Sequence, residues 1–320
     1  MEITLLIFNR NDNDNLINLV KDLYDYVQHI VLVDSSDEDK RQEIIEFSKR
    51  MGKIKYLYVA PLGYPDLLRK WAYRKSPSDW ILLIDTDERI NEEFKKDIGK
   101  IVGSNEADVY GIWRYPISDP ESKKKKIRTL QIRLFNKNFV EETGIVHELP
   151  IIKGRFKVLD EKYYMIHLHR EMGREDEYRR LEIFDRYSYC TLPERFKKII
   201  KILHLGAKMD CDKEITNLDY FLFFFFKEIY SSIITRDFRR FIFSFKNSLT
   251  KLERIKRMRT EEDGDENFEI SRIIRKNGII EFLNLDDDNT IEEINKNYTD
   301  LKGSELLIRL LKERYRKFKS

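Results

Sequence analysis

Two carboxylates two residues apart, Asp85 and Asp87, follow an apolar run that ends at Ile84. An Asp-x-Asp pair on a loop that leaves a buried strand can meet one divalent ion and a ribose hydroxyl. Oxygen ligands suit Mg²⁺ or Mn²⁺, which also take oxygens from a substrate diphosphate. The alternative is a solvated turn that caps the next helix. The pair is therefore a candidate metal site, and a helix-capping turn remains the alternative interpretation.

A second acidic cluster, residues 34–37, follows the apolar run at 30–33. Asp34 and Asp37 can bind a polar ligand, or they can cap the next helix together with the two serines between them. Both readings stay open.

The elements that must position these clusters alternate between strand and helix patterns over the first 115 residues. We expect strands at residues 3–8, 30–33, 53–59, 80–84 and 109–115, with helical spacing of apolar residues between most of them. Such alternation predicts a parallel sheet with helices on both faces, and ligands bind beyond the carboxyl ends of its strands. Both acidic clusters fall at that edge.

The middle of the chain has a different pattern. Residues 119–126 are polar and basic, as in a loop, whereas 129–135 alternates like a strand. A further strand-like stretch, 163–169, ends in His167-Leu168-His169. Its period of two puts both histidines on one face, as a metal pair requires. The alternative is one buried and one solvated histidine.

Beyond residue 170 the pattern is helical nearly to the end. We expect three parts: a catalytic domain at 1–170, a helical aromatic and basic region at 171–259, and an acidic linker with a small helical appendage at 260–320. In the last part, the leucines between 306 and 311 predict a helix over 306–318 that buries one side.

Composition limits the class of protein. The 320 residues include 60 Lys and Arg against 57 Asp and Glu, for a net charge of +3, and 41% are hydrophobic. This excludes a wholly disordered chain and argues against a dedicated nucleic-acid binder. Two cysteines exclude a disulfide scaffold and a cysteine-based zinc site. With no signal-peptide pattern and no apolar run of about 18 residues, we expect a cytoplasmic protein, soluble or peripheral to a membrane.

Taken together, the motifs resemble those of family 2 glycosyltransferases of the GT-A fold. The resemblance rests on the runs at 3–9, 31–37 and 79–88, with Arg69 between the last two. Residues 133–135 and 144–148 are similar to the RLF and G-x-VHE block of a branch that acts in lipopolysaccharide-core and surface-glycan assembly. The resemblance covers about residues 1–260. The chain departs from it at Arg10, where members commonly carry glutamate.

The resemblance implies a mixed α/β sheet of the GT-A type, a nucleoside-diphosphate sugar as donor, and Mg²⁺ or Mn²⁺ as cofactor. Asn9 would border the nucleotide, Asp34 would accept from the base, and Arg69 would contact the nucleotide or its phosphates. Asp85 would face ribose or the water shell of the metal, and Asp87 would coordinate the metal. A helix-surface charge is the alternative for Arg69.

The resemblance also implies a general base and a late histidine. Glu148 falls at the position of the base, with Glu141 and Glu142 as rivals and His147 beside it as a structural residue. His167 or His169 falls near the metal and diphosphate. In an inverting transfer the acceptor hydroxyl attacks the anomeric carbon, so a carboxylate must take its proton while cations stabilise the leaving diphosphate. Accordingly, no nucleophile elbow or phosphate-binding glycine loop is present.

A basic stretch follows the aromatic run at 220–226. Residues 236–259 contain nine Lys or Arg and two Asp or Glu. Aromatic and cationic helices suit an anionic membrane surface, and in the similar branch this region often delivers a lipid-linked acceptor. The alternative is phenylalanines packed on the catalytic domain beneath a solvated charged face.

Two other functions compete with glycosyl transfer. A sugar nucleotidyltransferase should carry a glycine-rich loop after the first strand, but residues 8–12 contain no glycine. A degenerate, non-catalytic GT-A domain that acts as a membrane-peripheral scaffold is opposed by the intact Asp85 and Asp87 pair.

Overall fold

The computed structural model describes residues 1–116, 129–142, 144, 150–168, 269–270, 273–274, 277–298, 301 and 303–320. Its strands are β1 (Ile3–Asn9), β2 (His29–Asp34), β3 (Ile54–Tyr58), β4 (Trp80–Leu83), β5 (Glu88–Ile90), β6 (Val109–Pro116), β7 (Thr129–Asn136), β8 (Val140–Glu141), β9 (Ile151–Ile152), β10 (Phe156–Val158) and β11 (Tyr164–His167). Its helices are α1 (Asn13–Leu23), α2 (Glu38–Arg50), α3 (Arg69–Lys75), α4 (Glu92–Gly103), α9 (Ile279–Leu283), α10 (Asp288–Asn297) and α11 (Ser304–Lys319), with short 3-10 turns at Tyr24–Tyr26, Pro65–Leu68 and Lys137–Phe139.

Within these ranges the main sheet is mixed. Its strand order is β3-β2-β1-β4-β7-β6-β11-β5, with β10 beside β6. The first four strands in this order are parallel, β7 runs antiparallel to both β4 and β6, and β5 runs antiparallel to β11. The carboxyl ends of β1 to β4 therefore meet at one edge, which positions the loops that follow them.

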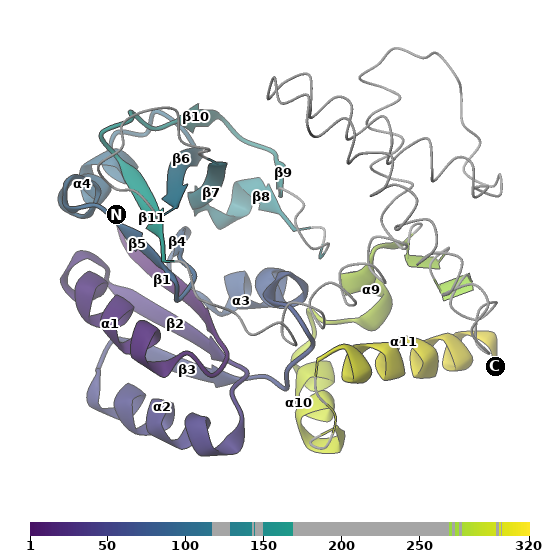
Figure 1. The fold of residues 1–320 in the computed structure, drawn as a ribbon. Coiled ribbons are helices and arrows are strands. Elements are labelled where there is room, and N and C mark those ends of the chain that lie inside the picture. The colour runs from purple at the N-terminus through teal and green to yellow at the C-terminus, as the bar shows by residue number, and fades with distance from the viewer. Residues whose placement is uncertain are drawn as a thin grey trace, which may run out of the picture. The chain divides into compact units, whose positions relative to one another are not determined.

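Apolar side chains of the parallel strands hold helices on both faces. Ile3, Leu5 and Ile7 of β1 form one buried cluster with residues of α1, α2 and α4. Successive residues of a strand point to opposite faces, so Leu6 lies on the other face, where α3 contacts β2. Figure 1 shows α1 and α2 on one side of the purple strands and α3 on the other. This sandwich rigidly supports the carboxyl edge.

The segment 283–309 belongs to the same compact unit as the described residues up to 168. Within it, α10 buries Ile291 and Ile294, and the first turns of α11 bury Leu306 and Leu307. The predicted one-sided helix at 306–318 is thus confirmed, and it begins at Ser304.

Most of the predicted elements are confirmed, with some corrections. The sequence pattern missed β5, which follows the turn after Asp85, and the short strands β8, β9 and β10. Between the strands expected at 53–59 and 80–84, where residues 67–74 have a helical pattern, the structure has a 3-10 turn followed by α3 from Arg69. The strand predicted at 163–169 ends at His167. The helices predicted between 171 and 259 and the predicted loop at 119–126 lie outside the described residues.

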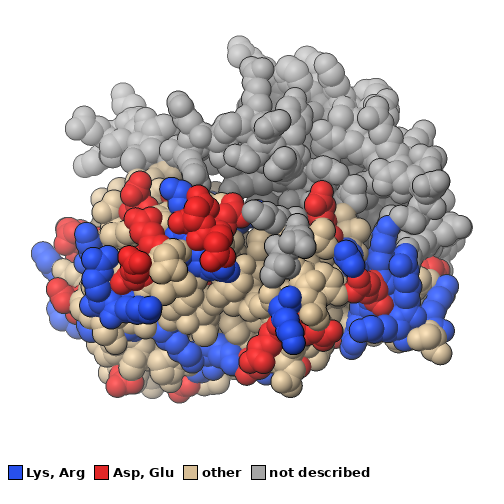
Figure 2. Space-filling model, turned by 90° about the horizontal axis from the view of Figure 1, so that it is seen from below, with Lys and Arg blue, Asp and Glu red and all other residues tan. Residues whose placement is uncertain are grey.

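Charged side chains of both signs are interspersed over the described part of the face shown in Figure 2. This agrees with the near balance of 60 basic and 57 acidic residues. No described helix combines the length and the apolarity needed to cross a membrane.

Leu82→Ala tests the central position of β4, because Leu82 is 0% exposed between β1 and β7. Deleting a leucine side chain from a packed core should lower the free energy of unfolding by about 2–5 kcal/mol, measured by urea denaturation. Ile151→Ala, at a side chain 48% exposed, is the control and should change it by less than about 0.5 kcal/mol. Equal losses in the two variants would contradict this core.

Candidate functional site

The turn between β4 and β5 carries the predicted metal-binding pair, and sheet pairing brings a histidine to it. β11 pairs with β5 so that His167 lies opposite Glu88, and the Leu168 N–H donates to the carbonyl of Asp87 at 2.7 Å. As a result, His167 Nε2 lies 3.2 Å from Asp87 Oδ2. The two side chains are 30% and 31% exposed, so the pair remains open to solvent.

The Asp87–His167 pair is electrostatically coupled. Burial acts to raise the pKa of Asp87, but the hydrogen bond and the charge of His167 outweigh it and lower that pKa below its ordinary value. The same hydrogen bond raises the pKa of His167 above its ordinary value. The pair is therefore a carboxylate beside an imidazole that holds its proton more tightly than usual.

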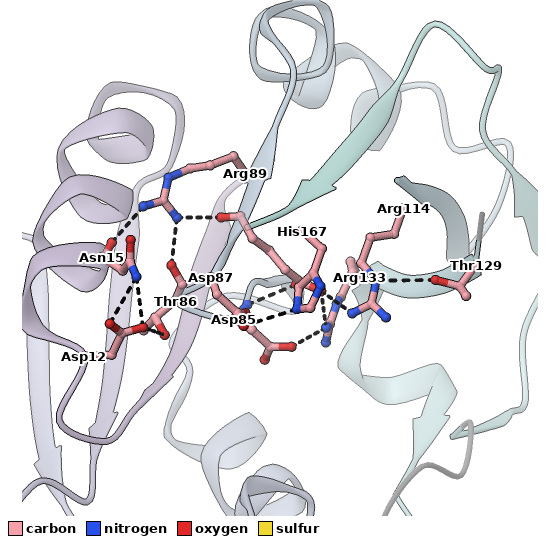
Figure 3. A network of polar contacts seen from close by, with 11 residues as sticks. Asp12, Asn15, Asp85, Thr86, Asp87, Arg89, Arg114, Thr129, Arg133 and His167 are labelled. Carbon is pink, nitrogen blue, oxygen red and sulfur yellow. Dashed lines mark hydrogen bonds and ion pairs between the residues drawn. The ribbon is translucent and has the colours of Figure 1, made fainter. Parts of the chain in front are cut away.

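Asp85 lies in a different set of contacts from Asp87. Its carboxylate forms an ion pair with Arg133, whose Nη2 also lies 2.7 Å from Oε1 of Glu88. Arg114 Nη1 lies 3.0 Å from the same Oε1, and the backbone N–H of Asp85 donates to Oε2 of Glu88 at 3.1 Å. Figure 3 shows Arg114 of β6 and Arg133 of β7 on the side of the turn that carries Asp85.

This arrangement separates the two carboxylates of the predicted metal pair. Asp85 lies against Arg133, and Asp87 lies against His167. Across the described ranges, no group of three or more His, Cys, Asp or Glu side chains is placed to hold a metal ion. The donor atoms that the protein brings together here are those of Asp87 and His167; His169 lies outside the described residues.

A second set of contacts fixes the turn from the side of α1. The Thr86 hydroxyl donates to Asp12 at 2.8 Å, and Arg89 donates to the carbonyls of Thr86 and Asn15 at 2.8 Å and 3.1 Å. Asp12 precedes α1, but its side chain makes no cap hydrogen bond. These contacts are visible at the left of Figure 3, and they limit the movement of residues 85–87.

Asn9 and Asp34 lie side by side because β1 and β2 pair in register at their last residues. Asp34 is 0% exposed. Its Oδ1 accepts from the Asn9 amide at 3.0 Å and the Ser36 hydroxyl at 2.6 Å, and its Oδ2 accepts from the Tyr56 hydroxyl at 3.0 Å. Burial and the Asp34 charge raise the pKa of Tyr56, so the phenol stays a donor. Both oxygens of the predicted base-binding carboxylate thus have protein partners.

Arg69 begins α3, and its side chain joins a buried cluster. Its Nη1 lies 2.9 Å from Asp66 and 3.8 Å from Glu142, while the Tyr73 hydroxyl donates to Glu142 at 2.5 Å. Burial acts to lower the pKa of Arg69, but the charges of Asp66 and Glu142 outweigh burial and raise that pKa above its ordinary value. The buried Arg69 Nε has no hydrogen-bond partner among the described residues. Arg69 is therefore a largely buried, paired residue, and the alternative of a helix-surface charge is wrong.

The structure describes the two alternative candidates for the general base, Glu141 and Glu142. The Glu142 side chain is 5% exposed and is bound to Tyr73 and Arg69. Glu141 is 49% exposed and pairs with Lys153 at 2.7 Å. His147 and Glu148 lie outside the described residues, so the role of Glu148 stays a prediction.

Sequence reasoning missed the charged groups that support the turn, namely Glu88, Arg114 and Arg133. The sequence places Arg133 inside a predicted strand, directly before Leu134 and Phe135. In the structure its side chain is 6% exposed, and the buried anion that it needs is Glu88.

Arg133→Ala tests this support. The variant should lose about 3–5 kcal/mol of stability, because Glu88 is 0% exposed and one of its two arginines is removed. Lys157→Ala, which breaks the exposed pair with Glu106, is the control and should leave the urea midpoint nearly unchanged. A stability loss no larger than that of the control would contradict the supporting role of Arg133.

Comparison with known proteins identifies the family. The model described as Glycosyl transferase family 2 matches residues 4–164, about half of the chain. An uncharacterised glycosyltransferase of Rickettsia typhi is 24% identical over 151 residues, which is 46% of this chain and 50% of that protein. One from Rickettsia felis is also 24% identical over 151 residues, 46% of this chain and 52% of that protein. The chain thus spans about half the length of these curated relatives.

Among solved structures, S. aureus TarS has a TM-score of 0.45 at 14% identity, with 77% of this chain and 55% of that chain covered. Residues 1–349 of TarS in complex with UDP-GlcNAc have a TM-score of 0.43 at 14% identity, with 86% and 92% covered. The mixed α/β sheet followed by helices that the sequence predicts is confirmed in the described residues. The match over residues 4–164 shows that the chain belongs to glycosyltransferase family 2.

Proposed function

We propose that this chain transfers a sugar, with inversion, from a nucleoside-diphosphate sugar to a hydroxyl of a glycan or lipid-linked acceptor, using Mn²⁺ or Mg²⁺. The observation that carries the proposal is the Asp87–His167 pair at the carboxyl edge of a family 2 domain. In sheets of this kind, ligands bind beyond the carboxyl ends of the parallel strands.

The chemistry of the pair fits a divalent cation. Asp87 Oδ2 and His167 Nε2 are 3.2 Å apart, and two ligands on neighbouring corners of an octahedron with bonds of about 2.1 Å lie about 3 Å apart. A carboxylate suits Mg²⁺ and Mn²⁺ alike, whereas an imidazole nitrogen favours a transition metal such as Mn²⁺. With two protein ligands, the remaining positions are left for water and diphosphate oxygens. We therefore propose Asp87 and His167 as the residues that hold the metal.

The role of Asp85 follows from its ion pair with Arg133. A carboxylate whose charge is already offset by a guanidinium is a weaker candidate for direct metal binding than one paired with a histidine, and the two carboxylates are about equally exposed, at 35% for Asp85 and 31% for Asp87. We propose that Asp85 faces the donor ribose or the water shell of the metal. Arg133 and Glu88 then hold the backbone from which Asp85 and Asp87 project.

The reaction needs one proton acceptor and charge neutralisation. The bound metal would offset the charge of the departing diphosphate. A bond forms between the acceptor oxygen and the anomeric carbon while the bond from that carbon to the diphosphate oxygen breaks, and we propose that Glu148 takes the acceptor proton. The buried contacts of Glu142 favour a structural role for that rival. The predicted membrane contact of residues 236–259 lies outside the described residues and stays a prediction.

Asp87→Asn and His167→Ala test the metal ligands. Each should weaken Mn²⁺-dependent binding of the preferred nucleoside diphosphate, UDP or GDP, by at least about tenfold in isothermal titration calorimetry. Asp25→Asn, at an exposed carboxylate, is the matched control and should bind like the wild type. Nucleotide binding that is equal with and without metal, or equal in all variants, would contradict the proposed metal site.

Glu148→Gln tests the proposed base. Its kcat for sugar transfer should fall by about 10²- to 10⁴-fold while the donor Kd stays unchanged, because a general base acts only in the chemical step. The control Glu141→Gln should keep the wild-type kcat. Donor binding without turnover in the wild type, with every acceptor class, would instead favour the scaffold reading.

A further inference from the structure

The C-terminal segment 286–303 reaches the carboxyl edge of the sheet through α10. The Asn295 side chain lies against the end of β3: its Oδ1 accepts from the Ala60 N–H at 2.8 Å, and its Nδ2 donates to the Tyr58 carbonyl at 2.9 Å. β3 is the edge strand in the sheet order, so these backbone groups have no further strand beside them. One amide side chain therefore satisfies both and fixes the path of the chain as it leaves β3.

The same segment touches the loop after β3 a second time. The Gly303 N–H donates to the Pro61 carbonyl at 2.8 Å. Gly303 has a φ of +61°, and a Cβ built on it would lie 3.8 Å from Nη1 of Arg10, which follows β1. Gly303 thus lies between the loops that leave β1 and β3, on either side of the buried Asp34 at the end of β2.

Three contacts with α3 anchor the segment. The Trp71 indole donates to Asp288 at 2.8 Å, Lys75 pairs with Asp288 at 2.5 Å, and Lys70 pairs with Asp286 at 3.3 Å. Figure 1 shows α10 beside the ends of β3 and α3. These contacts are spread over α3 and the loop after β3. We therefore treat the segment as part of the structure of this edge.

The strand order indicates whether the diphosphate or the nucleoside of a bound donor would lie beside this segment. The proposed metal and diphosphate position lies at the turn after β4, and β1, β2 and β3 follow in that order away from it. Neighbouring strands are about 4.8 Å apart, so two strands span about 10 Å, comparable to the distance from a diphosphate to its base. The nucleoside would therefore lie over β1 and β2, beside Gly303.

We infer that residues 286–298 and Gly303 form a wall of the donor nucleoside site and that Asn295 is a positioning residue for the loop 58–61. The inference rests on the proposed function, since it presumes a nucleoside-diphosphate donor. It adds to that function a part of the chain that contacts the end of β3 across 235 residues or more. A loop held in place before binding loses less entropy when the ligand arrives, so the contacts of Asn295 should strengthen nucleoside binding.

Asn295→Ala in the full chain tests the inference, with Asn297→Ala, an exposed amide on the same helix, as the matched control. Isothermal titration calorimetry with Mn²⁺ would compare two probes, the preferred nucleoside diphosphate and inorganic pyrophosphate. Asn295→Ala should weaken nucleoside-diphosphate binding about tenfold, the equivalent of about one hydrogen bond, and leave pyrophosphate binding unchanged. Asn297→Ala should bind both like the wild type.

The outcomes separate this inference from the proposed function. If the wild type binds nucleotide and Asn295→Ala binds it equally well or more tightly, this result contradicts the inferred wall but not the proposed function. If the wild type binds no nucleotide, both are overturned. Should Asn295→Ala fail to fold, hydrogen exchange of the wild type decides: nucleotide should slow exchange in residues 58–64 and 295–303 but not in α2, and unchanged exchange in 295–303 would overturn the wall.

Discussion

The Glu88 carboxylate is the buried charge on which the geometry of the edge depends. It is 0% exposed, it accepts from Arg133 and Arg114, and its second oxygen accepts from the backbone of Asp85. A buried carboxylate is costly unless it is paired, so the loss of any of these contacts should destabilise the edge. They join β5, β6 and β7 to the turn after β4. The pairing of β5 with β11 then places His167 beside Asp87 on this turn.

The site is assembled from parts of the chain that are distant in sequence. β5 pairs with β11, which brings His167 to Asp87 across 80 residues. Asp12 and Arg89 tie the same turn to α1, and Asn295 holds the loop after β3 from 235 residues away. The proposed metal end and the proposed nucleoside end are thus each supported by a different distant segment. In this chain, α10 contributes through Asn295 to the shape of the edge.

Much of the fold was predictable from local pattern, because the parallel strands are continuous apolar runs and the helices between them have one apolar side. The carboxyl edge was predictable for the same reason, and with it the neighbourhood of Asp85 and Asp87. The short strand β5 was not, since its three residues carry charge at two positions, Glu88 and Arg89, and form a strand only because β11 lies beside them. The separation of Asp85 from Asp87 could not be predicted either. It depends on Arg133, whose partner is set by register across three strands.

An anomalous difference map at the manganese absorption edge, from crystals grown with Mn²⁺ and the nucleoside diphosphate that binds best, tests the central claim most directly. The account predicts one peak within about 2.3 Å of both Asp87 Oδ2 and His167 Nε2, with the diphosphate on its open side and Asp85 still paired with Arg133. Nucleotide bound at this edge without a peak, or a peak held by Asp85 with His167 turned away, would contradict it.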